Sequence, residues 1–191
     1  MKTYAKLEAG ALRLMERVPN ISNPTDAQRA AYAAAHGFKE LRRTEKPGRY
    51  YAQGWHETAK LITETWTAWE LATAKKDALA VVQGHRDAAM NGVVIPCDAL
   101  PNGILFNTEA LTMANSLVIL SAQGSLPAGT TWTDAADVSH ELTSELLGSI
   151  VQAMLGHVNG TQARFAPARD AVNAAEDVDA VEAALELAET L

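Results

Sequence analysis

The feature that most constrains this chain is a run of apolar residues spaced four apart in its C-terminal half. Residues four positions apart lie on the same side of an α-helix, so a row of this kind forms an apolar stripe. Such a stripe is stable in water only when it is buried, which predicts a long helix at the centre of this half. The stripe comprises Leu142, Leu146, Ile150, Met154 and Val158, with Leu147, Val151 and Leu155 in the adjacent row.

Two breaks are expected after this stripe. Asn159-Gly160 is predicted to kink or end the helix, and Pro167 to interrupt any continuation, because proline lacks an N–H and clashes with the preceding turn. No Lys or Arg follows Arg169, so we interpret the acidic end as a solvated helix face, with docking on a neighbouring subunit as the alternative. The apolar face of this last helix comprises Val178, Val181, Leu185 and Ala188.

The first 67 residues carry a different pattern, seen most clearly where Leu61, Thr63 and Thr65 alternate with Ile62, Glu64 and Trp66 with the period of a β-strand. The alternation indicates a hairpin with arms at Tyr50–His56 and Lys60–Trp66. One helix is expected before it, from about Asp26 to Ala35. The remaining predicted strands are Tyr4–Leu7, Ala11–Met15 and Phe38–Arg43.

Local end signals support that helix. Thr25 or Asn23 can accept a hydrogen bond from the first helical turn, because short oxygen-bearing side chains are preferred at this position. Gly37 is expected to stop the helix, since glycine readily adopts the left-handed backbone that follows many helices.

From Ala68 onward the chain becomes alanine-rich and charged, without proline, as is typical of a helix. We predict one helix over Ala68–Asn91, then a small hairpin with arms at Val93–Ile95 and Ile104–Phe106. A helix capped by Asn107 or Thr108 follows. Its predicted inner face comprises Leu111, Ala114, Leu117, Val118 and Ser121, and a short strand at Trp132 precedes the long helix.

These patterns together predict an α+β protein in two parts. Residues 1–67 are expected to form a small antiparallel β-rich unit with one helix. Residues 68–191 are expected to form a mainly helical domain with a short hairpin.

Charge and composition restrict the classes of partner. The formal net charge is -7, and an acidic surface repels the phosphates of nucleic acid and of anionic lipid. No apolar run is long enough to span a bilayer. The single cysteine, Cys97, excludes an internal disulfide framework. We therefore expect neither a nucleic acid nor a membrane as partner.

The side chains that carry chemistry form no recognisable catalytic or metal-binding pattern. His140-Glu141 resembles the start of a zinc-protease motif, but Ser144 stands where the second histidine would be. Cys97 has no activating partner nearby in the sequence. We expect no enzyme activity, metal or cofactor; a deep pocket gathering His140, Glu141 and Cys97 would favour the enzyme interpretation.

One basic cluster interrupts the acidic composition. A nucleic-acid patch is one interpretation, but Glu40 and Glu45 lie among the cations, and charged strands also protect a sheet from edge pairing. We prefer the second, structural interpretation. The cluster comprises Lys39, Arg42, Arg43, Lys46 and Arg49.

Three tryptophans, Trp55, Trp66 and Trp69, lie close together near the expected boundary between the two parts. Large aromatic rings are costly to leave in water, and they are strong anchors at protein interfaces. Two interpretations stay open at this point: the rings form a small junction core, or they form a partner-binding surface.

The C-terminal half resembles an uncharacterised domain found at the C-termini of phage and prophage tail proteins. The resembling features are Arg86–Gly92, the hairpin ending at Phe106, the capped helix from Thr108, the strand Thr131–Asp134, the helix start Leu142–Leu146 and the alanine-rich acidic end. The N-terminal half is similar to the small β unit of short tail-fibre-associated proteins. There the features are Asn23-Pro24-Thr25 before a Tyr/Ala helix, a Gly-Phe strand and a Trp-bearing hairpin.

This resemblance implies a non-enzymatic phage tail accessory protein, in the first instance a tail-fibre assembly chaperone. A structural component of the virion tail fibre or baseplate is the alternative. The implied partner is a phage tail-fibre or baseplate protein, with self-association into a homo-oligomer as a further expectation. The implied location is the host cytoplasm during assembly, or the virion tail. The resemblance transfers no catalytic residues.

Overall fold

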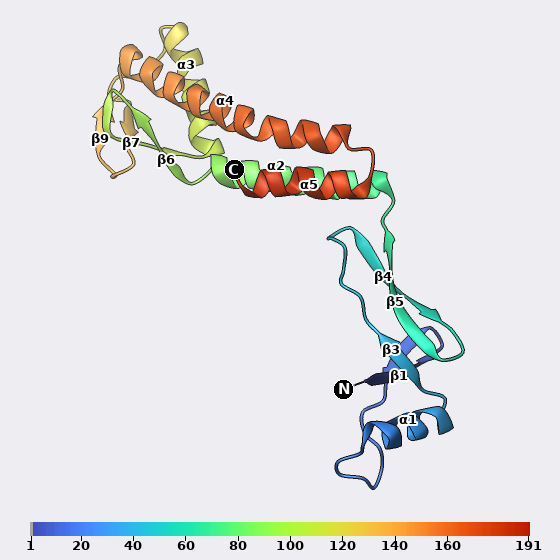
Figure 1. The fold of residues 1–191 in the computed structure, drawn as a ribbon. Helices are drawn as coiled ribbons and strands as arrows, with labels where there is room; N and C mark the ends of the chain where they lie inside the picture. The colour runs from blue at the N-terminus through green and yellow to red at the C-terminus, as the bar shows by residue number, and fades with distance from the viewer. Residues whose placement is uncertain (1) are drawn as a thin grey trace. The chain divides into compact units, whose positions relative to one another are not determined.

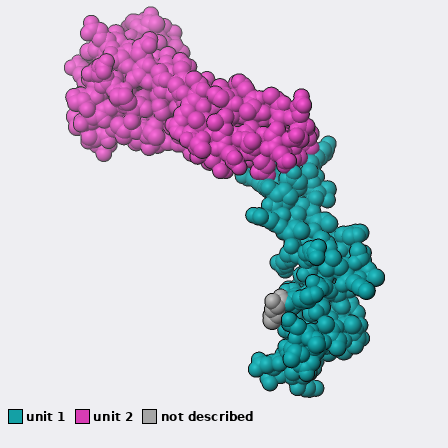
Figure 2. All heavy atoms as spheres, viewed as in Figure 1, with its two compact units in different colours: residues 1–70 teal, residues 71–191 magenta. Residues whose placement is uncertain are grey.

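A computed structural model describes residues 2–191. The chain divides into two compact units, residues 1–70 and residues 71–191 (Figures 1 and 2). The protein is α+β, with most strands in the first unit and most helices in the second, which confirms the predicted fold class. None of the helices in the described part of the chain is long and apolar enough to cross a membrane.

The N-terminal unit is built on a five-stranded sheet in the order β2-β1-β3-β5-β4. The predicted antiparallel pairing applies to three of its strand pairs, whereas β3 and β5 run parallel. The chain leaves β3, forms the outer strand β4, and returns as β5 between them, which makes that pair parallel. The strands are β1 (Thr3–Glu8), β2 (Ala11–Leu14), β3 (Lys39–Arg42), β4 (Tyr51–Glu57) and β5 (Leu61–Ala68).

Helix α1 (Asp26–Ala35) packs over one face of this sheet. Thr25 caps it and forms a reciprocal capping box with Gln28, while Gly37 follows with a φ of 74°. The predicted helix bounds and cap are confirmed. The apolar side chains that this face buries are Tyr4, Met15, Val18 and Ala33, with Tyr32 and Phe38 at the margin.

The other face of the sheet is covered by side chains from its own edges. Ala5, Leu41 and Ile62 form its buried centre. Leu12 on edge strand β2 and Trp55 on edge strand β4 both pack against this centre. Each edge strand lies beside a strand that carries this centre, because β2 pairs with β1 and β4 pairs with β5.

The C-terminal unit contains four helices and two hairpins in the described chain. The helices are α2 (Leu71–Met90), α3 (Thr108–Ala122), α4 (Ser144–Ala174) and α5 (Val178–Glu189). The hairpins pair β6 (Val93–Cys97) with β7 (Leu100–Phe106), and β8 (Thr131–Thr133) with β9 (Ser139–Glu141).

Helix α4 runs through both halves of this unit (Figure 1). Its N-terminal part packs with α3 and the hairpins around a core that contains Ile150, Met154, Phe106 and Trp132. Its C-terminal part packs with α2 and α5. The predicted inner face of α5 is confirmed, because all four of its residues are buried: Val178, Val181, Leu185 and Ala188.

The predicted end of the long helix at Asn159-Gly160 and its predicted interruption at Pro167 are wrong. Helix α4 continues through Asn159-Gly160 and Pro167 to Ala174. Phe165 and Val172 are buried on its inner side, and that burial holds the backbone helical. Pro167 and Ala163 are exposed, so water can satisfy the Ala163 carbonyl oxygen that the missing N–H leaves without a helical partner.

The start of one helix and the burial of two side chains also differ from the predictions. Helix α2 begins at Leu71 rather than near Ala68, because Ala68 still pairs with Tyr51 in the sheet. Val118 of α3 and Leu155 of α4 are exposed, although the sequence placed both on buried faces.

Candidate interaction surfaces

Trp55 and Trp66 lie on the same face of the sheet, and the side chain of each makes contacts within the N-terminal unit. Trp55 packs against the buried cluster around Ile62. The indole Nε1–H of Trp66 donates a hydrogen bond of 3.1 Å to the Thr44 hydroxyl. Both rings are therefore only partly available to a partner.

Trp69 is placed differently. It follows the end of β5, and its backbone N–H donates to the Tyr50 carbonyl oxygen at 2.9 Å. Its ring meets that of Tyr50 edge to face, with centroids 5.5 Å apart. Trp69 is 40% exposed, so of the three predicted residues it is the most accessible to a partner.

A buried carboxylate beside Trp66 was not recognised from the sequence. Glu64 accepts hydrogen bonds from the Thr44 N–H (3.0 Å) and from the Gln53 side-chain amide. The Thr44 hydroxyl donates in turn to the Glu64 carbonyl oxygen. The spacing along the strand could have identified this position. Glu64 lies two residues from both Ile62 and Trp66, so its side chain lies on the same face of the sheet as theirs.

A second buried carboxylate joins the two hairpins of the C-terminal unit. Asp134 accepts hydrogen bonds from His140 Nε2 (2.9 Å) and the Asn102 amide (2.8 Å). It also accepts from the N–H groups of Ala136 (2.9 Å) and Val138 (3.0 Å). The bond from His140 and then those from the other donors hold the pKa of Asp134 well below its ordinary value, although burial opposes them.

Asp134→Asn is expected to destabilise the C-terminal unit at neutral pH, because an amide nitrogen would face the donors of Asn102 and His140. The lowered pKa means that the stabilisation from Asp134 is complete above the ordinary value of 3.8 and is lost as the pH falls below it. The difference in urea midpoint between wild type and Asp134→Asn should therefore narrow in acid. Asp137→Asn, an exposed position in the same turn, is the matched control, and equal loss in both variants would contradict this role.

His140, Glu141 and Cys97, whose gathering in one deep pocket would have favoured an enzyme, do not line a common pocket. His140 and Glu141 line one surface hollow, Cys97 lines another, and the two hollows share Glu145 and Ser149. His140 Nε2 is bonded to Asp134, and the Ser149 hydroxyl donates to its own helix at 3.2 Å. Among residues 2–191, no three His, Cys, Asp or Glu side chains lie close enough to hold a metal ion.

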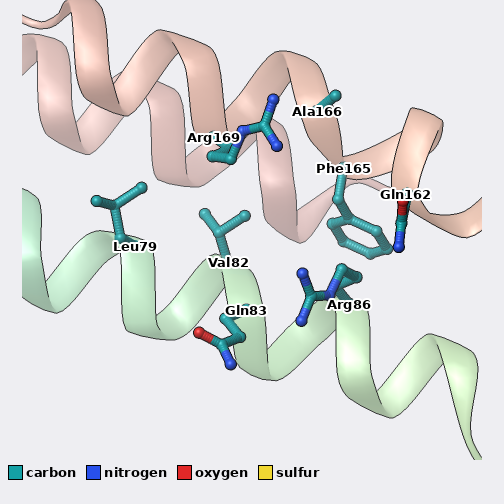
Figure 3. A pocket seen from close by; sticks show the side chains of 8 residues that line it. All are labelled: Leu79, Val82, Gln83, Arg86, Gln162, Phe165, Ala166 and Arg169. Carbon is teal, nitrogen blue, oxygen red and sulfur yellow. The ribbon is translucent and has the colours of Figure 1, made fainter.

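A groove of about 330 Å³ lies between α2 and α4 (Figure 3). Its lining mixes apolar and polar side chains, and Arg86 and Arg169 contribute two cations. Each guanidinium is already paired with the next residue, Asp87 at 2.7 Å and Asp170 at 2.8 Å. The full lining is Leu79, Val82, Gln83, Arg86, Gln162, Phe165, Ala166 and Arg169.

The two units carry opposite formal charge. Residues 1–70 contain 11 Lys and Arg against 8 Asp and Glu, a net charge of +3. Residues 71–191 contain 5 against 15, a net charge of -10, and the two values add to the -7 of the whole chain. The acidic character that disfavours phosphate-bearing partners therefore belongs to the C-terminal unit.

The fold and these surfaces define a two-unit α+β protein whose C-terminal unit is a helical domain. The family model described as domain of unknown function (DUF4376) matches residues 73–186, and the chain belongs to this family. The match lies within the C-terminal unit. Comparison with curated proteins finds no match, and comparison with solved structures finds none either.

Proposed function

We propose that the protein is a non-enzymatic accessory protein of a phage tail, acting as an assembly chaperone for the tail fibre. The sequence resemblance supplies the phage tail context. In this proposal the N-terminal unit holds a segment of a tail-fibre or baseplate protein while that protein assembles. The alternative within the same context is a structural component that remains on the fibre or baseplate.

The observation that carries the proposal is the exposed ring of Trp69 at the end of the β4–β5 pair. An exposed aromatic side chain is a strong anchor for a protein partner. Strand β4 lies at the edge of the sheet, where an extended segment of a partner can add a further strand. The net charge of +3 on this unit favours an acidic segment.

Two tryptophan variants separate binding from folding. Trp69→Ala is expected to weaken co-purification of the co-expressed tail-fibre protein and to lower the melting temperature less than Trp55→Ala does, because part of its ring is in water although the rest contacts Tyr50. Trp55→Ala is expected to lower the melting temperature, because its ring packs on the centre of the sheet.

Co-purification is measured by quantitative mass spectrometry of the captured proteins, and melting by circular dichroism. Trp69→Phe, which retains an aromatic ring, should recover part of the binding. The proposal fails if the folded wild-type protein captures no tail protein. It fails equally if Trp69→Ala captures the fibre protein as well as wild type does.

A further inference from the structure

The groove between α2 and α4 concentrates positive charge in a unit that is otherwise acidic. Residues 71–191 contain 5 Lys and Arg against 15 Asp and Glu. Two of these cations, Arg86 from α2 and Arg169 from α4, line this one groove, and none of its lining residues is acidic (Figure 3). The groove is therefore locally complementary to a negatively charged group.

Each guanidinium of the groove keeps donors for a ligand. Arg86 binds one oxygen of Asp87 through Nε at 3.1 Å and Nη2 at 2.7 Å. Arg169 binds one oxygen of Asp170 through the same two atoms, at 3.0 Å and 2.8 Å. Within residues 2–191, Nη1 of either arginine makes no hydrogen bond or ion pair, although each Nη1 carries two N–H donors.

The existing ion pairs do not block such a ligand. The side chains of Asp87 and Asp170 are 48% and 64% exposed, and ion pairs between exposed neighbours are weak. A bound carboxylate can therefore add to these pairs or replace them.

The apolar part of the lining suits the body of the ligand. Leu79 and Val82 of α2 and Phe165 of α4 point into the space between the two helices (Figure 3). Val82 and Phe165 are each only 4% exposed, so the packing of the two helices holds them in place. An apolar chain lying against these side chains would lose its contact with water.

The size of the groove favours a small ligand. Its volume of about 330 Å³ lies at the lower end of the usual range for small-molecule sites, roughly 300–1,000 Å³. The α2 side of the lining extends from Leu79 to Arg86, which is about two helical turns or roughly 10 Å. A large acidic protein would be repelled by the net charge of -10 on the surrounding unit, whereas a small monoanion is repelled least.

We propose that this groove binds a small carboxylic acid that carries an apolar chain. Arg86 and Arg169 bind the carboxylate, and the chain lies against Leu79, Val82 and Phe165. A free phosphate would leave the apolar side chains uncovered, and a neutral apolar molecule would forgo the charge-assisted hydrogen bonds of the arginines. The proposal concerns the C-terminal unit alone and does not depend on the proposed tail function.

Amide NMR spectra of the nitrogen-labelled full chain, titrated with octanoate, test this site. We expect saturable shifts at residues of α2 and α4 around the groove. Arg86→Gln and Arg169→Gln should each weaken binding about tenfold, because each removes charge-assisted hydrogen bonds to the carboxylate. Lys76→Gln is the matched control, since it removes the same charge from an exposed position of α2 outside the lining and should bind octanoate as wild type does.

A filled groove tests the apolar half of the site. Ala166→Leu keeps both arginines but adds bulk to the lining, so it should abolish octanoate binding, while circular dichroism establishes that each variant is folded. Octanol and inorganic phosphate should each bind more weakly than octanoate. The proposal is overturned if wild type shows no saturable shift or if either probe binds as tightly as octanoate. Unchanged affinity in both arginine variants would overturn it as well.

Discussion

Ile150→Ala is expected to lower the free energy of unfolding of the C-terminal unit by about 2–5 kcal/mol, the usual cost of truncating a fully buried isoleucine. Ile150 is 0% exposed and lies in the core where α4 meets α3 and the hairpins. The variant removes apolar surface from this core, and the close packing around it allows only partial collapse of the cavity.

Leu155→Ala in the same helix is the matched control, because Leu155 is 43% exposed and should cost little. Urea unfolding followed by circular dichroism measures both variants. Equal unfolding midpoints for the two variants would mean that the Ile150 side of α4 is not the buried side.

Gly103→Ala is expected to destabilise the β6–β7 hairpin strongly. Gly103 has a φ of 72°, a conformation that costs a residue with a Cβ about 1–2 kcal/mol. A Cβ added there would also lie 2.5 Å from the Ile95 carbonyl oxygen, a backbone atom of the paired strand. The strands must therefore move apart, which adds overpacking strain of about 1–3 kcal/mol.

The same glycine is tied to the second hairpin, because its carbonyl oxygen accepts a hydrogen bond of 3.2 Å from the Ala135 N–H. Gly156→Ala is the opposite control, since an added Cβ meets nothing within 4 Å in α4 and should stabilise the helix by about 0.5–1 kcal/mol. Thermal melting should give a lower melting temperature than wild type for Gly103→Ala and a higher one for Gly156→Ala. A melting temperature of Gly103→Ala equal to that of wild type would contradict the described hairpin.

Local signals were sufficient for elements whose ends are set by neighbouring residues. Thr25 and Gly37 mark the two ends of α1, and Asn107 marks the start of α3, because capping interactions span only three or four residues. The same reasoning failed at Pro167. There the packing of a whole helix face outweighs the cost of one proline, and distant residues supply that packing.

Pairings between distant segments could not be predicted. The parallel contact between β3 and β5 arises because β4 forms the outer strand and β5 returns between β4 and β3, an order that no local pattern encodes. Strand β9 (Ser139–Glu141) is polar, and its pairing with β8 is anchored by the buried Asp134 carboxylate. A polar stretch of three residues carries no alternation that would mark it as a strand.

The candidate site was predicted in part. Nearness in sequence suggested that Trp55, Trp66 and Trp69 act together, but the structure gives the first two contacts within the fold and leaves Trp69 the most exposed. Val118 was assigned to the inner face of α3 but is exposed, as are Met113, Ile119 and Leu120. Helices that are apolar on most sides do not reveal which side is buried.

We propose that the protein acts by binding a tail protein during assembly. Quantitative mass spectrometry of a tagged chain captured from cells in which its phage assembles, together with the finished particles, tests this proposal. We expect a tail-fibre or baseplate protein among the captured proteins, at a level that falls with Trp69→Ala. A chaperone should be absent from finished particles, whereas a structural component would be present in them. A folded chain that captures no tail protein and is absent from the particles would mean that the protein has no role in tail assembly.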